Sequence, residues 1–246
     1  MGRIIFMIKG LISAIGFLTI IPVKSHNITE RTLFWFPLVG LSLGVILVIL
    51  NSAFIKFFPS NLNIIILLTI YIMLTGALHL DGFADTVDAI AGGNGNKNRI
   101  LEIMSDSHIG SIGVVALICL LGLKYVSLIN LTGTTFNKVL LIMPLMGRWS
   151  MVFSMLLSKP AKTEGLGKYF ISNVSILSVI LSTLITAIFL FLFLGQKCVY
   201  ILGAVIIVVL LINLFFNKIL GGITGDILGA VCEISELTTL LVLQII

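Results

Sequence analysis

Long apolar runs separated by short polar breaks are the feature that most constrains the fold of this chain. The runs occupy residues 4–22, 34–55, 62–80, 109–131, 138–157, 174–194, 198–216 and 227–246. A helix needs roughly 20 apolar residues to cross a bilayer, so each run has a suitable length. Only 10% of the residues are charged, far below the share typical of a water-soluble domain. We therefore predict an all-α, polytopic membrane bundle of about seven or eight hydrophobic helices, forming a single domain over residues 1–246.

The first apolar run allows two arrangements. It begins like a signal peptide, with Arg3 ahead of an apolar stretch, but it lacks a small-x-small cleavage site and Lys9 interrupts it. We expect it to be retained. The sequence leaves open whether residues 4–22 span the bilayer or lie in its interface as an amphipathic helix.

Four polar breaks are expected on the same side of the membrane. Counting alternate sides from the predicted spans places residues 23–33, 81–108, 158–173 and 217–226 on one face. This face carries more Lys and Arg than the other, so the positive-inside rule predicts that it is cytoplasmic in a prokaryotic cell membrane. The basic residues are scattered rather than gathered in one run, and we expect no nucleic-acid partner.

The stretch HLDGFADTVDA, residues 79–89, concentrates carboxylates in an otherwise apolar chain. Asp81, Asp85 and Asp88 stand at i, i+4 and i+7, which places them on one stripe of a helix. Three like charges placed in this way repel one another unless a cation lies among them or their pKa values rise. Mg²⁺ favours clustered carboxylate oxygens and commonly bridges to substrate phosphates. The spacing therefore predicts a metal or phosphate site that includes these three residues.

Further acidic pairs occur near two other motifs. Glu102 and Asp106 repeat the i, i+4 spacing, and Asp226 and Glu233 lie seven residues apart on one helical face. All ten acids fall in or next to breaks assigned to the predicted cytoplasmic face. We expect the acidic patches to close around a common pocket, where nearby glycines let the backbone approach a ligand. The acids interpreted singly as solvated or capping residues are Glu30, Glu164 and Glu236.

Several other polar side chains leave alternatives open. His79 is compatible with a metal ligand, a general base or a boundary histidine with ordinary partners, and His108 invites the same alternatives. Arg148 lies inside an apolar run, so we expect it to pair with an acid or an anionic substrate rather than face lipid. Lys124 either pairs in the same way or extends its amine to the interface.

An ordered set of motifs carries a resemblance to a known family. HLDGFADTVDA, LEIMSDSHIGSIG, EGLGKYF and GGITGDILGAVCEISEL follow one another, with FLTIIPV and FPLVGLSLG nearer the N-terminus. Together they cover nearly the whole chain and resemble the cobalamin synthase family, the adenosylcobinamide-GDP ribazoletransferases. The resemblance implies a Mg²⁺-dependent membrane transferase that joins adenosylcobinamide-GDP to α-ribazole, or to its 5′-phosphate, and releases GMP. The implied product is adenosylcobalamin or its 5′-phosphate, so the reaction is the last assembly step of the nucleotide loop.

The resemblance also implies roles for individual residues. By family motif the metal-binding role is carried onto Asp81, Asp85, Asp88, Asp106 and Asp226, with Glu102 and Glu233 as further candidates. The candidate catalytic residues are Asp81, Asp85, Asp88 and His79. The candidate substrate-binding residues are Gly82, His108, Gly110, Arg148, Lys162, Gly165, Gly167, Thr224 and Gly225. His108 stands where Arg is usual in the family, and Ile223 stands where Gln is common.

Two other function classes remain as alternatives. A CDP-alcohol phosphotransferase-like lipid head-group enzyme also uses aspartates on membrane helices with a divalent metal, but here DG is followed by ADTVDA rather than by the DGxxAR continuation of that class. A cation transporter places its acids near the bilayer midplane, often within repeats, whereas these acids are expected at one surface and no repeat is visible. The oligomeric state is left open, including a homo-oligomer.

Overall fold

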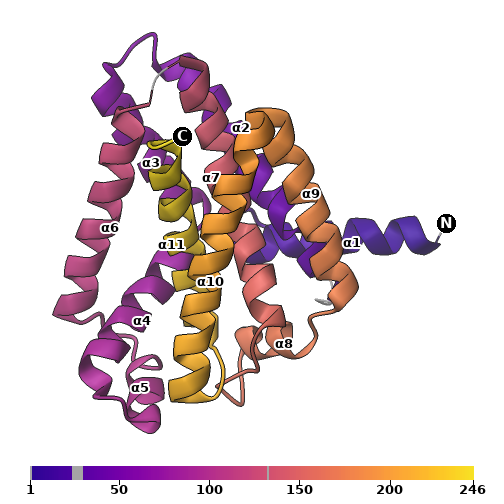
Figure 1. The fold of residues 1–246 in the computed structure, drawn as a ribbon, viewed down its shortest axis with the longest axis vertical. Coiled ribbons are helices and arrows are strands. Elements are labelled where there is room, and N and C mark those ends of the chain that lie inside the picture. The colour runs from indigo at the N-terminus through magenta and orange to yellow at the C-terminus, as the bar shows by residue number, and fades with distance from the viewer. Residues whose placement is uncertain (1, 24–29, 132) are drawn as a thin grey trace.

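The computed structural model describes the backbone of residues 2–23, 30–131 and 133–246, and the side chains of 8–23, 32–131 and 133–246. Within these ranges the chain is helical and contains no strand (Figure 1). The elements are α1 (Gly2–Leu18), η1 (Glu30–Trp35), α2 (Phe36–Phe54), α3 (Ser60–Leu74), α4 (Leu78–Gly93), α5 (Lys97–Ile103), α6 (Ser111–Ile129), α7 (Gly133–Leu156), α8 (Leu166–Ser172), α9 (Ile176–Leu194), η2 (Gly195–Lys197), α10 (Cys198–Leu220) and α11 (Gly225–Leu243). The predicted all-α bundle is confirmed, whereas the single-domain organisation stays a prediction.

The apolar run at 62–80 is not one helix, although it is continuous in the sequence. α3 ends at Leu74, and α4 begins at Leu78 after a bend of 87°. Gly76 and Ala77 separate them with positive φ angles of 60° and 56°. A right-handed helix cannot continue through residues in this conformation, so the prediction of a single helix is corrected here.

Residues 81–108, predicted to be a polar break, contain most of α4 and all of α5. The helix expected from the i, i+4 and i+7 spacing of Asp81, Asp85 and Asp88 is therefore confirmed within this break. α4 is amphipathic, with Ala84 and Ala89 buried and Asp81 exposed. It packs against α6 and α11, and such tertiary packing supplies most of the stability of a short helix.

Four helical segments in the described part of the chain are long and apolar enough to cross a membrane. They are Thr32–Phe54, Ser111–Ile129, Gly133–Leu156 and Ile176–Leu220. The last comprises α9 and α10, which run side by side in opposite directions (Figure 1). The bent pair α3–α4 provides a fifth candidate, although α4 itself carries three aspartates and is not among the four.

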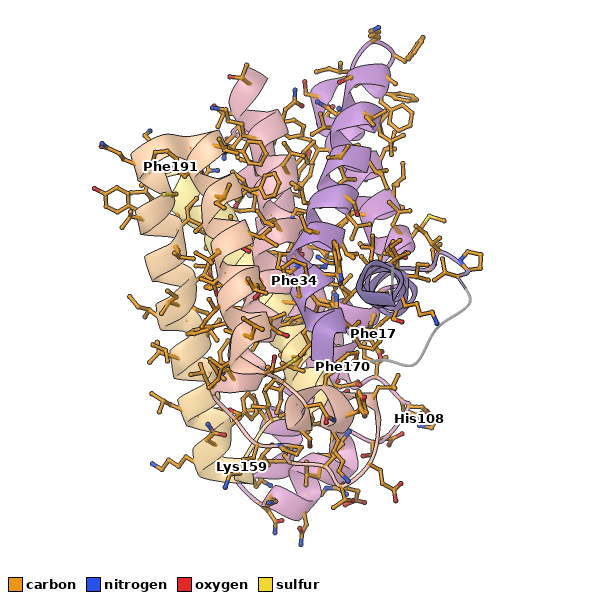
Figure 2. All side chains as sticks on the ribbon, turned by 90° about the vertical axis from the view of Figure 1, so that its right-hand side faces the viewer. Phe17, Phe34, His108, Lys159, Phe170 and Phe191 are labelled. Carbon is orange, nitrogen blue, oxygen red and sulfur yellow. The ribbon has the colours of Figure 1, made fainter. Side chains whose placement is uncertain are left out.

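Helix α1 lies across the bundle rather than along it. Figures 1 and 2 both show its axis turned sideways to the long helices. Its apolar part, Ile8–Leu18, is shorter than a membrane span. The Ile20 N–H donates to the Leu74 carbonyl at 2.9 Å, which ties the segment after α1 to the end of α3. This arrangement favours the interfacial alternative for residues 4–22.

The core is formed by α2, α7 and α11, with α7 between the other two. Gly40 and Gly44 on α2 face the backbone of α7, where a Cβ at either position would overlap a carbonyl oxygen of Pro144 or Leu140. Small residues four apart let two membrane helices approach closely and gain van der Waals contact. α11 packs against α4, α7 and α10, so its first turn has a defined position relative to α4.

Candidate active site at one end of the bundle

Three polar segments that are far apart in the sequence meet at one end of the molecule. The Ala161 N–H donates to the Ile223 carbonyl at 2.8 Å, and the Ile223 N–H donates to the Lys159 carbonyl at 2.9 Å. Lys162 Nζ donates to the Met104 carbonyl at 3.0 Å, which joins the end of α5 to the same region. Figure 2 shows Lys159 and His108 at this end of the bundle. Three of the four predicted breaks therefore lie at one end of the molecule, whereas most of the fourth, residues 23–33, lies outside the described residues.

Close backbone approach brings the start of α11 against α4 and α8. A Cβ on Gly82 would lie 2.8 Å from the Asp226 carbonyl oxygen, and a Cβ on Gly167 would lie 2.7 Å from the Gly225 nitrogen. Thr224 caps α11, since its hydroxyl accepts a backbone N–H of the first turn at 3.2 Å. These predicted substrate-binding residues therefore have a structural role, because they set the distance between the three helices.

Three acids lie near this junction, and we name Asp81, Asp85 and Asp226 the surface cluster. Partial burial raises the pKa of Asp85 to about 6, and the negative charge of Asp81 adds to that rise. The charge of Asp226 acts in the same direction, whereas Lys162 opposes it. The charges of the three acids thus act on one another, but the expected common pocket is only partly formed, since Glu102 and Asp106 are exposed and Glu233 is buried elsewhere.

Lys162 is the cation that belongs to the surface cluster. Its Nζ donates to Asp226 Oδ2 at 2.9 Å, and both side chains are about a quarter exposed. The Thr224 hydroxyl lies 3.3 Å from the same carboxylate oxygen. One lysine among three carboxylates leaves an excess of negative charge at this end of α4.

Asp88 has a different role from the other two aspartates of α4. Its two carboxylate oxygens accept the backbone N–H groups of Gly110 at 2.7 Å and Gly113 at 2.8 Å. These N–H groups belong to the N-terminus of α6, which has no helical partner for them. A Cβ on either glycine would overlap the Asp88 carboxylate. Asp88 therefore caps α6, and its predicted catalytic and metal-binding roles stay predictions.

A cleft of about 180 Å³ opens beside the surface cluster. Its polar lining includes His79, Asp81 and Asp226, and the rest is mainly apolar. His79 is only 2% exposed, and its Nε2 has no hydrogen-bond partner among the described residues. An unsatisfied buried imidazole nitrogen is costly, so it indicates a place where a ligand atom or water would bind.

The surface cluster fits a hard divalent cation in charge and in donor type. In the part of the chain that the structure describes, no three His, Cys, Asp or Glu side chains form a ready-made metal site. Mg²⁺ commonly takes one or two protein carboxylates, while substrate phosphates and water complete its shell. Asp81, Asp85 and Asp226 are therefore compatible with a magnesium site that a phosphate-bearing substrate completes.

The acids after α4 are exposed and pair with neighbours in the sequence. Glu102 Oε2 lies 2.9 Å from Arg99 Nη1, and Asp106 Oδ1 lies 2.7 Å from His108 Nδ1. Hydrogen bonds from His108 hold the pKa of Asp106 below its usual value. The metal-binding roles of Glu102 and Asp106, and the substrate-binding role of His108, stay predictions.

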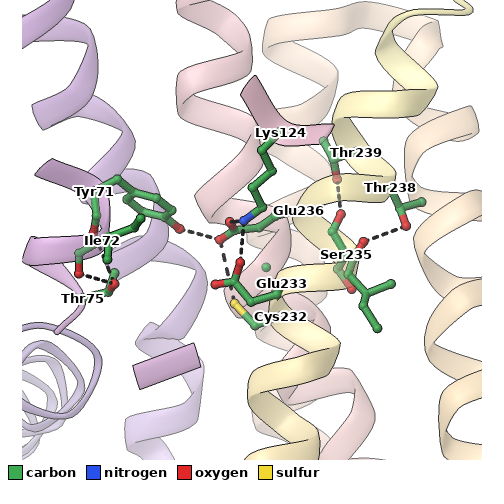
Figure 3. Close-up of polar contacts among 12 residues, drawn as sticks. Tyr71, Ile72, Thr75, Lys124, Cys232, Glu233, Ser235, Glu236, Thr238 and Thr239 are labelled. Atoms are coloured by element: carbon green, nitrogen blue, oxygen red, sulfur yellow. Dashed lines mark hydrogen bonds and ion pairs between the residues drawn. The ribbon is translucent and has the colours of Figure 1, made fainter. Parts of the chain in front are cut away.

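A second group of charged residues lies inside the bundle, and we name Tyr71, Lys124, Arg148, Glu233 and Glu236 the buried network. Lys124 Nζ lies 2.6 Å from carboxylate oxygens of both Glu233 and Glu236. Arg148 Nη1 lies 2.5 Å from the other oxygen of Glu236. The same oxygen accepts a hydrogen bond from the Tyr71 hydroxyl (Figure 3). The network contains one lysine, one arginine and two glutamates, so its net charge is close to zero.

The buried network corrects two interpretations and resolves two alternatives. Glu236 is fully buried rather than solvated or capping, and Glu233 is paired with Lys124 rather than placed at the surface with Asp226. Seven residues of helix separate Asp226 from Glu233, which is about 10 Å along the axis. Arg148 pairs with an acid, as expected, and Lys124 pairs rather than reaching the interface. Substrate binding by Arg148 stays a prediction.

Sequence reasoning missed the apolar walls of the cleft, which come from α1, α7, α8 and α11. Phe17, Met151, Met155 and Phe170 are among them. In a chain with 59% hydrophobic residues, no sequence signal distinguishes such positions from ordinary packing. Gly165, the last predicted substrate-binding glycine, precedes α8 with a φ of 98°, and its predicted role stays untested.

Comparisons with known proteins identify the family of this chain. The model of a family described as cobalamin-5-phosphate synthase matches residues 10–244. A Clostridium tetani protein is 38% identical over 235 residues, covering 93% of each chain, and one from Acetivibrio thermocellus is 40% identical, covering 93% of this chain and 94% of its own. A Thermoanaerobacter protein (strain X514) is 36% identical over 241 residues, covering 95% of this chain and 96% of its own. All three are named adenosylcobinamide-GDP ribazoletransferase, and no solved structure matches the chain.

The fold and the surface cluster define a polytopic membrane enzyme of the transferase class. Since the family match covers nearly the whole chain, this protein belongs to the cobalamin-5-phosphate synthase family.

Proposed function

We propose that this protein is an adenosylcobinamide-GDP ribazoletransferase, which joins adenosylcobinamide-GDP to α-ribazole or its 5′-phosphate and releases GMP. The observation that carries the proposal is that Asp81 and Asp226 line one cleft, with Asp85 near them, in a chain that matches this family over residues 10–244. The reaction needs a site that holds a pyrophosphate and neutralises its charge, because phosphoryl transfer depends mainly on positioning and electrostatics.

The reaction exchanges one bond at phosphorus for another. A ribose hydroxyl oxygen of α-ribazole forms a bond to the phosphorus that carries cobinamide. The bond from that phosphorus to the bridging oxygen breaks, and GMP leaves with this oxygen. The hydroxyl proton passes to a nearby acceptor, for which Asp85, beside the cleft, is the candidate.

Asp81, Asp85 and Asp226 would hold Mg²⁺ together with the substrate phosphates. When bound, Mg²⁺ supplies charge neutralisation at the phosphate oxygens. Lys162 keeps the Asp226 carboxylate in place through its 2.9 Å contact and adds a positive charge near the phosphates. Gly82 and Gly167 keep α4, α8 and α11 close enough for these side chains to act on one substrate.

We place the surface cluster on the cytoplasmic side of the cell membrane. Lysines and arginines at this end include Lys97, Arg99, Lys159, Lys162 and Lys168, and the positive-inside rule supports this orientation. The charged corrinoid nucleotide and ribazole would then reach the cleft without crossing the bilayer.

The test uses the purified full chain in detergent or lipid nanodiscs. We expect adenosylcobinamide-GDP and α-ribazole to yield GMP and a corrinoid product only when Mg²⁺ is present, and removal of the metal with a chelator to stop the reaction. Asp85→Asn should remove the activity while the protein remains folded by circular dichroism. Full activity of Asp85→Asn would reject the assigned role, and turnover of a CDP-lipid without any corrinoid product would favour the lipid head-group alternative.

A further inference from the structure

The cleft beside the surface cluster has two chemically different ends. Asp81 and Asp226 provide carboxylates, whereas Met151, Met155 and Leu166 provide apolar walls. A ligand that fits both ends carries charged or hydroxyl groups on one side and an apolar group on the other. The cleft is therefore not accounted for by phosphate binding alone.

Aromatic and methionine side chains form the apolar walls. Phe17 and Phe170 both line the cleft, and their ring centroids lie 4.7 Å apart (Figure 2). Phe36 supports them from behind, with its ring centroid 5.6 Å from that of Phe170. Methionine sulfur makes favourable contacts with aromatic rings, and aromatic rings pack well against one another. These walls favour a flat aromatic guest over a flexible alkyl chain.

The size of the cleft limits what can enter it. An apolar cavity of about 150 Å³ is known to hold benzene, so a cleft of about 180 Å³ fits one aromatic ring system. A corrin macrocycle is far larger. Guanine has the right shape, but its carbonyl, ring N–H and amino group would be left unpaired against phenylalanine and methionine walls.

His79 is a buried polar residue beside the apolar walls. It lines the cleft, is 2% exposed, and its Nε2 lacks a hydrogen-bond partner in the described chain. A benzimidazole riboside is apolar except for one unsubstituted ring nitrogen, which accepts a hydrogen bond. If the His79 ring turned toward the cleft, its Nε2–H group would donate to that nitrogen, and both atoms would then be paired.

We infer that the apolar cleft between Phe17, Met155 and Phe170 binds the benzimidazole base of α-ribazole, with its ribose directed toward Asp81 and Asp226. This inference rests on the proposed function and deepens it, since it assigns the two substrates to different parts of the site. The base lies in the cleft, and the pyrophosphate of the other substrate lies at the carboxylates. α1 then serves substrate binding, because it carries Phe17 into the cleft wall.

The test measures binding and turnover separately. Isothermal titration calorimetry of α-ribazole into the full chain, without the corrinoid substrate, gives its Kd, and steady-state kinetics give KM for each substrate. Met155→Ala should raise the Kd and the KM of α-ribazole by about tenfold and leave the KM of adenosylcobinamide-GDP unchanged. Met143→Ala is the matched control, because Met143 is equally buried on α7 but does not line the cleft.

A second variant keeps the inference testable if Met155→Ala fails to fold. Leu166 lines the cleft but is 56% exposed, so Leu166→Ala should keep the fold and raise the same Kd about threefold. Guanosine should not displace α-ribazole. The inference is overturned if α-ribazole produces no binding heat, if the variants change only the KM of the corrinoid substrate, or if guanosine competes equally. Binding that responds to Met155→Ala without any corrinoid product would instead reject the proposed function and keep the cleft assignment.

Discussion

The surface cluster and the buried network place carboxylates of the same helix in opposite situations. Asp226 stands in the first turn of α11, beside a cleft and two other acids, with only Lys162 as a cation. Glu236, farther along α11, is fully buried and contacts both Lys124 and Arg148. The first group carries surplus negative charge that a ligand must neutralise, whereas the second is neutralised by the protein itself.

This difference separates residues that serve chemistry from residues that serve assembly. A buried ion pair contributes little net stability, but removal of one partner leaves an uncompensated charge in an apolar interior. An exposed carboxylate that awaits a cation contributes little to folding and much to binding. Mutations in the two groups should therefore affect different measurements.

The largest expected effect is on activity in the surface cluster. Asp81→Asn removes a negative charge without changing shape, so kcat/KM should fall about 100-fold or more if this carboxylate acts on the metal or substrate. The free energy of unfolding should change by less than about 0.5 kcal/mol because Asp81 is exposed. Glu164→Gln is the control, since Glu164 is also exposed but lies outside the surface cluster. Equal losses in both variants would contradict the distinction.

The next effect is on stability in the buried network. Lys124→Met leaves Glu233 and Glu236 without their shared cation, and it should lower the free energy of unfolding by about 3–5 kcal/mol. Adding Glu233→Gln should recover part of the loss, because one buried negative charge is then removed. Lys138→Met makes the same change at an exposed position and should have little effect. Thermal unfolding of the purified proteins in one detergent checks all three.

A smaller effect is expected where Asp88 caps α6. Gly113→Ala would displace the Asp88 carboxylate from the backbone N–H groups and cost about 1–2 kcal/mol of stability. Gly122→Ala on the same helix meets no atom within 4 Å and should stabilise by about 0.5 kcal/mol through higher helix propensity. If both variants destabilise the protein equally in thermal unfolding, the capping role of Asp88 is wrong.

The smallest effect belongs to the exposed pair of Arg99 and Glu102. Their side chains are more than half exposed, and such pairs contribute about 0.5 kcal/mol or less. Arg99→Gln should leave the unfolding temperature almost unchanged. A large loss of activity in Arg99→Gln without loss of stability would instead bring α5 into the site and revise the boundary of the surface cluster.

Much of the fold follows from local pattern, and the exceptions depend on contacts with other parts of the chain. The apolar runs predict most of the long helices, because each run must satisfy its backbone groups internally in a membrane. The pattern missed the bend at Gly76 and Ala77, since both residues are compatible with an apolar run and the positive φ angles depend on the surrounding contacts. The helical spacing of the aspartates did predict a helix through Asp88, but the pattern missed that this helix begins at Leu78, inside the apolar run.

The acidic residues of the candidate site could be predicted because charged residues are rare in this chain. Asp81, Asp85 and Asp226 are conspicuous in a chain with ten acids, and helical spacing places the first two on one face. Spacing also puts Glu233 on the face of Asp226, but it cannot give the depth at which each residue lies. That depth depends on the packing of α4, α6 and α7 around α11.

The sequence alone determined that this protein is a membrane bundle with its acidic motifs at one end, because hydropathy and residue spacing act along a single helix. Only the tertiary structure decided which acids face a ligand and which face Lys124 and Arg148. It also decided that Phe17, Met155 and His79 share one cleft. Such pairings join residues far apart in the chain, and they exist only when the helices have packed together.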